Sequence, residues 1–92
     1  MEIAMVTDLQ ARSQYRTAKE KSKGAIALVK VGDFYKTYDD DAETVARLCG
    51  TLTKMNDDVK YTEFPKQALD FFLPRLIRNG HRVCICESNE QS

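Results

Sequence analysis

Three residues near the carboxyl end of the chain have side chains that could bind a metal ion. They are His81, Cys84 and Cys86, in the pattern His-x-x-Cys-x-Cys. A structural zinc site normally has four ligands, and no second ligand pair accompanies these three. Cys84 and Cys86 would also share one face of a strand, where buried cysteines are common. We therefore expect no metal ion and no other cofactor.

A run of carboxylates, Asp39-Asp40-Asp41 followed by Glu43, could suggest divalent-metal catalysis. Adjacent residues at a helix start point in different directions, so they rarely converge on one ion. Carboxylates there interact favourably with the positive end of the helix dipole and can cap free amide groups. Helix capping is therefore the predicted role of this run.

The sequence also lacks the motifs of the common catalytic sites. Its four glycines form no phosphate-binding loop, and Gly-Lys-Ser/Thr is absent. No serine lies in a Gly-x-Ser-x-Gly turn. We expect a non-enzymatic protein with no catalytic residues and no small-molecule substrate, which works by binding a partner.

Length and composition are those of one globular domain spanning residues 1–92. The chain is 42% hydrophobic and 30% charged, which argues against disorder. It has no apolar run long enough to span a membrane and no signal-peptide pattern. Three cysteines, an odd count, predict free thiols in a cytoplasmic protein. The formal net charge is zero, so any contact with nucleic acid must come from a local patch.

Hydrophobic spacing and turn signals predict an α+β domain, a mixed β-sheet with helices packed against it. The element order is α-β-β-α-β-β-α-β. The predicted elements are a helix over 7–23, strands over 25–31 and 34–38, a helix over 39–49, strands over 51–54 and 59–64, a helix from Pro65 to Gly80, and a strand over 82–87. Thr7 is the expected cap of the first helix. Pro74 should kink or split the third helix.

One segment carries a family resemblance. Residues 31–42, Val-Gly-Asp-Phe-Tyr-Lys-Thr-Tyr-Asp-Asp-Asp-Ala, resemble the Met-Gly-Asp-Phe-Tyr-Glu-Leu-Phe-Tyr-Asp-Asp-Ala segment of the N-terminal mismatch-recognition domain of MutS proteins. Leu52-Thr53-Lys54 is similar to that family's Leu-Thr-Lys strand. Residues 79–87 are similar to its Asn-Gln-Gly-Glu-Ser-Val-Ala-Ile-Cys-Glu-Gln ending. The resemblance covers residues 25–88 and is fairly specific as a set.

The resemblance implies a DNA-binding α/β module that approaches from the minor groove. In that family the Phe stacks on a mispaired or unpaired base, and the following Glu hydrogen-bonds to it. Phe34 would therefore be the wedge. Lys36 occupies the position of the Glu, and an ammonium donates hydrogen bonds and attracts phosphate where a carboxylate accepts. Lys36 is the expected phosphate or base contact, and Lys54 is a further candidate.

Full MutS proteins continue into connector, lever, clamp and ATPase domains, so this chain corresponds only to their start. We expect a stand-alone protein that binds mismatched or distorted duplex DNA weakly and in a salt-sensitive way. The alternative is a protein-interaction module that kept the fold and lost mismatch recognition. Exposure of Phe34 would favour the first interpretation, and burial would favour the second.

Overall fold

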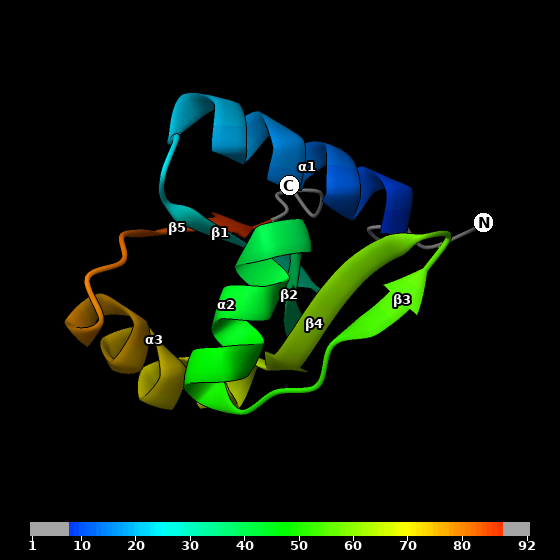
Figure 1. Ribbon diagram of the computed structural model, residues 1–92. Helices are drawn as coiled ribbons and strands as arrows, with labels where there is room; N and C mark the ends of the chain where they lie inside the picture. The colour runs from blue at the N-terminus through cyan, green and yellow to red at the C-terminus, as the bar shows by residue number, and fades with distance from the viewer. Residues whose placement is uncertain (1–7, 88–92) are drawn as a thin grey trace.

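The computed structural model describes residues 8–87 and consists of one mixed five-stranded sheet with helices on both faces (Figure 1). The strands are β1 (Ile26–Val31), β2 (Phe34–Tyr38), β3 (Lys54–Asn56), β4 (Val59–Pro65) and β5 (Val83–Glu87). Their spatial order is β3-β4-β2-β1-β5. The β1–β5 pair is parallel and the other three pairs are antiparallel.

Helix α1 (Asp8–Lys21) covers one face of the sheet, and α2 (Asp39–Cys49) and α3 (Leu69–Arg78) cover the other (Figure 1). β1 separates the two cores because its side chains alternate between the faces. Ala27 and Val29 pack under α1, whereas Ile26 and Leu28 pack under α2 and α3. Both faces of β1 are therefore buried, which explains its nearly continuous apolar sequence.

The α1 core includes Ala11, Tyr15 and Ala18, which are spaced along one side of that helix. The opposite core is built around Tyr35, Phe64 and Leu76, together with the apolar side of α2. Helix α2 ends at Gly50, whose φ of 80° lies in the left-handed region and whose N–H bonds to Ala46 O. A glycine adopts this conformation without the steric cost of a Cβ atom. No helix within residues 8–87 is long and apolar enough to cross a membrane.

The α+β class, the mixed sheet and the element order agree with the sequence prediction. The third helix differs, because residues 66–68 form a 3-10 turn, η1 (Lys66–Ala68), and the α-helix then runs unbroken through Pro74. The prediction was a kink or a split at Pro74, and the split is not found. The predicted cap at Thr7 lies outside the described residues.

The carboxylate run starts α2 as predicted, but the N-cap position is Tyr38 and has no side-chain capping bond. Asp41 instead turns toward the sheet, where it contacts α1 and β1. The predicted strand over 51–54 begins only at Lys54. Thr62 Oγ1 bonds to Thr51 Oγ1 and donates to Leu52 O, which holds this stretch beside β4 without ladder pairing.

Candidate nucleic-acid interface

Phe34 begins β2, directly after the two-residue turn at Gly32 and Asp33. Gly32 has a φ of 62°, a conformation that glycine favours, and this allows β1 to reverse tightly into β2. The ring of Phe34 is 42% exposed. Its register neighbours are Val31 on β1 and Pro65 on β4. The hairpin therefore presents an aromatic ring at its end, outside both cores.

The rest of the hairpin is held rigidly behind this ring. Tyr35 points to the opposite face, where its ring centroid lies 5.8 Å from that of Phe64. Its hydroxyl donates to Glu87 Oε2 at 3.1 Å, and burial together with this bond raises the pKa of Tyr35. At the turn, the Lys66 N–H donates to Asp33 O at 2.8 Å. The wedge candidate thus stands on a strand fixed from both sides.

Phe34 and Lys36 lie on the same face of the sheet, because they are two residues apart on β2. This is the α1 face, since Tyr38, two residues further, belongs to the α1 core. Lys54 pairs with Tyr61 in register and lies on this face as well, but on β3, two strands from β2. The structure brings Phe34 and Lys36 together. Lys54 is separated from them by two strand spacings, which puts β3 about 10 Å from β2 across the sheet.

Two further residues at this face, Tyr61 and Glu63, were not singled out from the sequence. Glu63 is the register partner of Lys36, and its Oε2 lies 3.4 Å from Lys54 Nζ. The Lys36 ammonium lies 4.6 Å from the ring centroid of Tyr61. These contacts depend on how β4 aligns with β2 and β3, which no local sequence pattern specifies. Alternation along residues 59–65 could have placed Tyr61 and Glu63 on one face.

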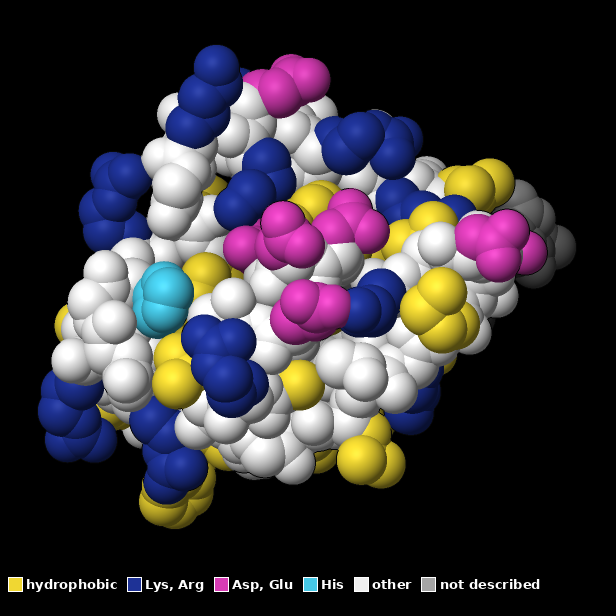
Figure 2. Space-filling view, in the orientation of Figure 1, with side chains coloured by type: hydrophobic (Ala, Val, Ile, Leu, Met, Phe, Trp, Pro, Cys, Tyr) yellow, Lys and Arg dark blue, Asp and Glu magenta, His cyan; other side chains and the backbone are white. Residues whose placement is uncertain are grey.

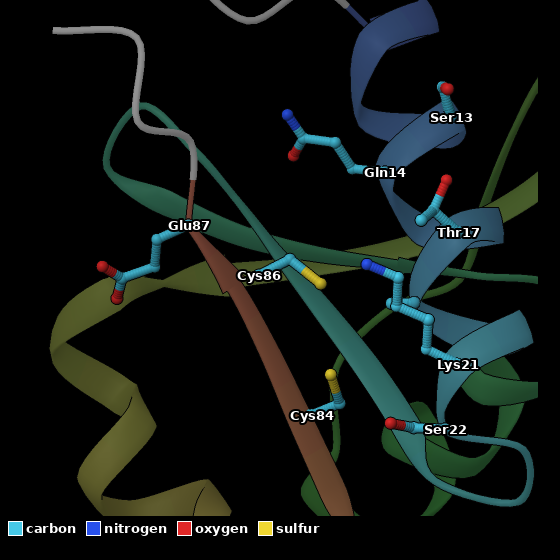
Figure 3. Close-up of a pocket in the computed structure, with 9 residues that line it drawn as sticks. Ser13, Gln14, Thr17, Lys21, Ser22, Cys84, Cys86 and Glu87 are labelled. Atoms are coloured by element: carbon cyan, nitrogen blue, oxygen red, sulfur yellow. The ribbon is translucent and has the colours of Figure 1, made fainter. Parts of the chain in front are cut away.

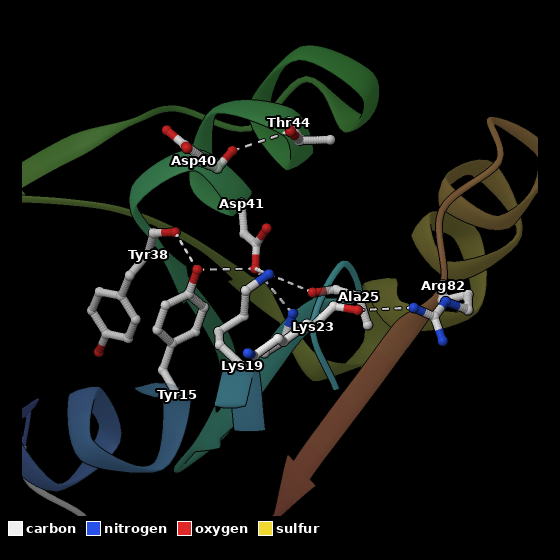
Figure 4. A network of polar contacts seen from close by, with 10 residues as sticks. Tyr15, Lys19, Lys23, Ala25, Tyr38, Asp40, Asp41, Thr44 and Arg82 are labelled. Carbon is white, nitrogen blue, oxygen red and sulfur yellow. Dashed lines mark hydrogen bonds and ion pairs between the residues drawn. The ribbon is translucent and has the colours of Figure 1, made fainter. Parts of the chain in front are cut away.

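A buried polar cluster fixes α1 over the sheet (Figure 4). Asp41 Oδ2 accepts a bond from the Tyr15 hydroxyl at 2.9 Å and another from the Ala27 N–H at 3.1 Å. The Lys19 ammonium lies 2.9 Å from the same oxygen. The Tyr15 hydroxyl also donates to Tyr38 O at 3.0 Å. Burial, and then the charge of Asp41, raise the pKa of Tyr15 strongly.

A groove opens between α1 and β5, with the sulfur atoms of Cys84 and Cys86 turned toward α1 (Figure 3). Burial, and then the neighbouring Cys84, raise the pKa of Cys86 to about 11. Thiols with raised pKa values are poor nucleophiles and poor metal ligands at neutral pH. His81 lies in the loop before β5. Within residues 8–87, no three histidine, cysteine or acidic side chains gather at a distance suited to a metal ion.

Comparison with known proteins gives one consistent result. The family model described as MutS domain I matches residues 10–92. The DNA mismatch repair protein MutS of Salinibacter ruber is 52% identical over 84 residues, which cover 86% of this chain and 9% of that protein. MutS of Cytophaga hutchinsonii is 43% identical over 84% of this chain and 10% of its own length. MutS of Thermosipho melanesiensis is 35% identical over 86% of this chain and 10% of its own length. The chain therefore spans about a tenth of the length of these relatives.

Proposed function

Since the chain belongs to the MutS domain I family, we propose that it is a non-enzymatic DNA-binding domain that recognises mismatched or distorted duplex through Phe34. The observation that carries this proposal is the exposure of Phe34 at the end of the tightly turned β1–β2 hairpin. The relatives are named for DNA mismatch repair, and the Phe34 hairpin lies inside the matched region. DNA is accordingly the proposed partner.

In the proposed mechanism, a defect is recognised because its base step costs less free energy to unstack than a matched step. An apolar side chain that enters a base step unstacks it and kinks the duplex, at a cost of a few kcal/mol. Mispaired steps are already weakened, so the cost is smaller there. Stacking of a base on an aromatic ring returns about 1–3 kcal/mol. The balance favours insertion at a defect, and the ring needs no hydrogen bond to a base edge to find it.

Lys36 and Lys54 are proposed to contact phosphate, since both lie on the face that carries Phe34. Phosphate contacts supply most of the affinity of DNA-binding proteins and make it dependent on salt. Two such contacts are few for a DNA-binding surface, so binding through them should be weak at physiological salt. Lys36→Gln should lower affinity for matched and mismatched duplex equally and reduce the salt slope by about one.

The proposal is tested by measuring affinity for a duplex with one G·T mismatch or one unpaired thymine, and for the matched duplex, at low salt. Phe34→Ala should reduce affinity for the defective duplex about tenfold, the loss expected for one stacking contact. Phe71→Ala is the matched control, because Phe71 is also an exposed phenylalanine but lies on α3, on the other side of the sheet. Equal affinity for both duplexes, unchanged by Phe34→Ala, would contradict the proposal.

A second candidate function, a protein-interaction module, is favoured by the outer side of α3. Phe71 is 76% exposed there, and Ile77 is also exposed. Arg75 and Arg78 are exposed on the same helix. Figure 2 shows basic and apolar side chains gathered over α3, and acidic side chains over α2. A mixed apolar and basic patch suits an acidic protein partner.

The second candidate predicts association that depends on this patch. Sedimentation velocity should show self-association, or a stable complex with an acidic partner, that Phe71→Ala weakens and Phe34→Ala leaves unchanged. A monomer in both variants, combined with a preference for defective DNA, would favour the first candidate.

A further inference from the structure

The proposed interface has a carboxylate in a place that the family resemblance does not predict. In the MutS segment that residues 31–42 resemble, the residue two positions after the Phe is a Glu, and this chain has Lys36 there. The register pairs Lys36 with Glu63 on β4. Residues paired in this way project from the same face of the sheet with their Cβ atoms about 5 Å apart. A carboxylate is therefore present beside position 36, one strand away.

We propose that Glu63 provides the hydrogen-bond acceptor for the base on which Phe34 stacks, in the role that a glutamate at position 36 would have. This inference rests on the proposed DNA-binding function and names a residue that determines its specificity. Its basis is the juxtaposition of Phe34, Lys36 and Glu63 on one face of the sheet, where Phe34 is exposed and the other two are partly exposed.

The distances between backbone positions allow this role. Phe34 pairs with Pro65, so Glu63 is its diagonal neighbour on the same face. Diagonal neighbours in an antiparallel pair are about 7–8 Å apart. Residues i and i+2 along one strand, such as Phe34 and Lys36, are about 6.6 Å apart. Positions 36 and 63 are thus nearly equally far from Phe34, and the length of a glutamate side chain makes up the difference of about 1 Å.

The surroundings leave the carboxylate available. The side chain of Glu63 is 28% exposed, and Lys54 Nζ lies 3.4 Å from its Oε2. Ion pairs at the surface contribute little, so this contact can be exchanged for a base N–H without a large cost. A mispaired or unpaired base has N–H groups that no Watson–Crick partner accepts. A carboxylate is an acceptor-only group and would bond to such donors.

The flanking lysines address the main electrostatic objection, which is that a carboxylate is repelled by the phosphate backbone. Lys36 and Lys54 flank Glu63 on the two neighbouring strands. The formal charge of these three side chains is +1, because two ammonium groups outweigh one carboxylate. The group as a whole is therefore attracted to DNA, and its centre still offers an acceptor.

The test compares Glu63→Gln with the wild-type chain on the mismatched and matched duplexes described above. We expect the ratio of the two affinities to fall about tenfold, the change expected for one hydrogen bond to a charged group. Affinity for the matched duplex should rise slightly, because a negative charge is removed near phosphate. Glu63→Asp, which keeps the carboxylate, should retain part of the ratio.

Glu43→Gln is the matched control, because Glu43 also pairs with a lysine, Lys60, but lies on α2, away from the proposed interface. It should leave the ratio unchanged. A ratio that Phe34→Ala abolishes and Glu63→Gln does not alter would overturn the role of Glu63 and leave the proposed function standing. A wild-type ratio of one would overturn both.

Discussion

Replacement of Asp41 should destabilise the domain more than replacement of any other carboxylate of its run. The reason is the position of β1, whose ladder with β2 begins at Val29 and Lys36. Ala27 lies two residues before Val29 on β1, and β2 has no residue paired with it because the chain leaves the sheet there to form α2. Its buried N–H therefore has no strand partner on that side, and Asp41 Oδ2 accepts it at 3.1 Å.

The magnitude follows from what each donor keeps when the carboxylate is removed. In Asp41→Ala, the Tyr15 hydroxyl still donates to Tyr38 O, and the Lys19 ammonium still contacts Ala25 O. The Ala27 N–H is left unsatisfied, at a cost of about 1–3 kcal/mol. Loss of the charged contacts adds to this, so the free energy of unfolding should fall by about 2–4 kcal/mol. Asp41→Asn keeps an acceptor for the amide and should cost about 1 kcal/mol.

Urea unfolding followed by circular dichroism measures the change. With a slope of about 1 kcal/mol per molar urea, typical of a small domain, Asp41→Ala should lower the midpoint by about 2 M or more. Asp40→Ala is the control, because Asp40 is exposed and should cost only the few tenths of a kcal/mol of a first-turn carboxylate. If the two alanine variants unfold at the same urea concentration, the account of Asp41 as a replacement strand partner is wrong.

Three other predictions concern groups outside the interface. The folded state keeps Tyr15 protonated, whereas the unfolded chain releases that proton near pH 10, so the free energy of unfolding should fall as the pH rises above 10. In Tyr15→Phe this fall, measured by urea unfolding between pH 9 and 11, should be smaller. With a pKa of about 11, Cys86 is about 0.1% thiolate at pH 8, so a disulfide reagent should label it about a hundredfold more slowly in the native than in the unfolded chain, as mass spectrometry would show. Pro74→Ala should raise the free energy of unfolding by about 1–3 kcal/mol, because it restores a helix-interior N–H, and a lower urea midpoint would contradict this.

The sequence predicted elements where local chemistry determines them. Gly32 and Asp33 between two apolar runs specified the β1–β2 hairpin, and the spacing of apolar residues specified α2. Lys54 begins β3 where the strand over 51–54 was expected to end, because Thr62 on β4 binds the preceding residues. That contact joins residues far apart in sequence, and no local propensity reveals it.

In the candidate site, too, local sequence predicted some residues, whereas others depend on contacts between distant segments. The family resemblance indicated Phe34 and Lys36, and the alternation of strand side chains places them on one face. Glu63 was missed because it becomes a neighbour of Lys36 only when β4 aligns with β2. Asp41 was interpreted as a capping residue because its position in α2 is local information, whereas its contacts with Tyr15 and Ala27 are not. Register and burial account for both differences.

The parallel pairing of β1 with β5 affects how the chain folds during its synthesis. β1 is made before β5, yet one of its two edges is closed only by residues 83–87 of that later strand. While the ribosome is still producing the intervening helices, the hairpin of β1 and β2 exposes an apolar strand edge of the kind that recruits other chains. A nascent or prematurely terminated product that ends before residue 83 should therefore aggregate. The exposed edge of β1 is covered only after β5 leaves the exit tunnel and pairs with it.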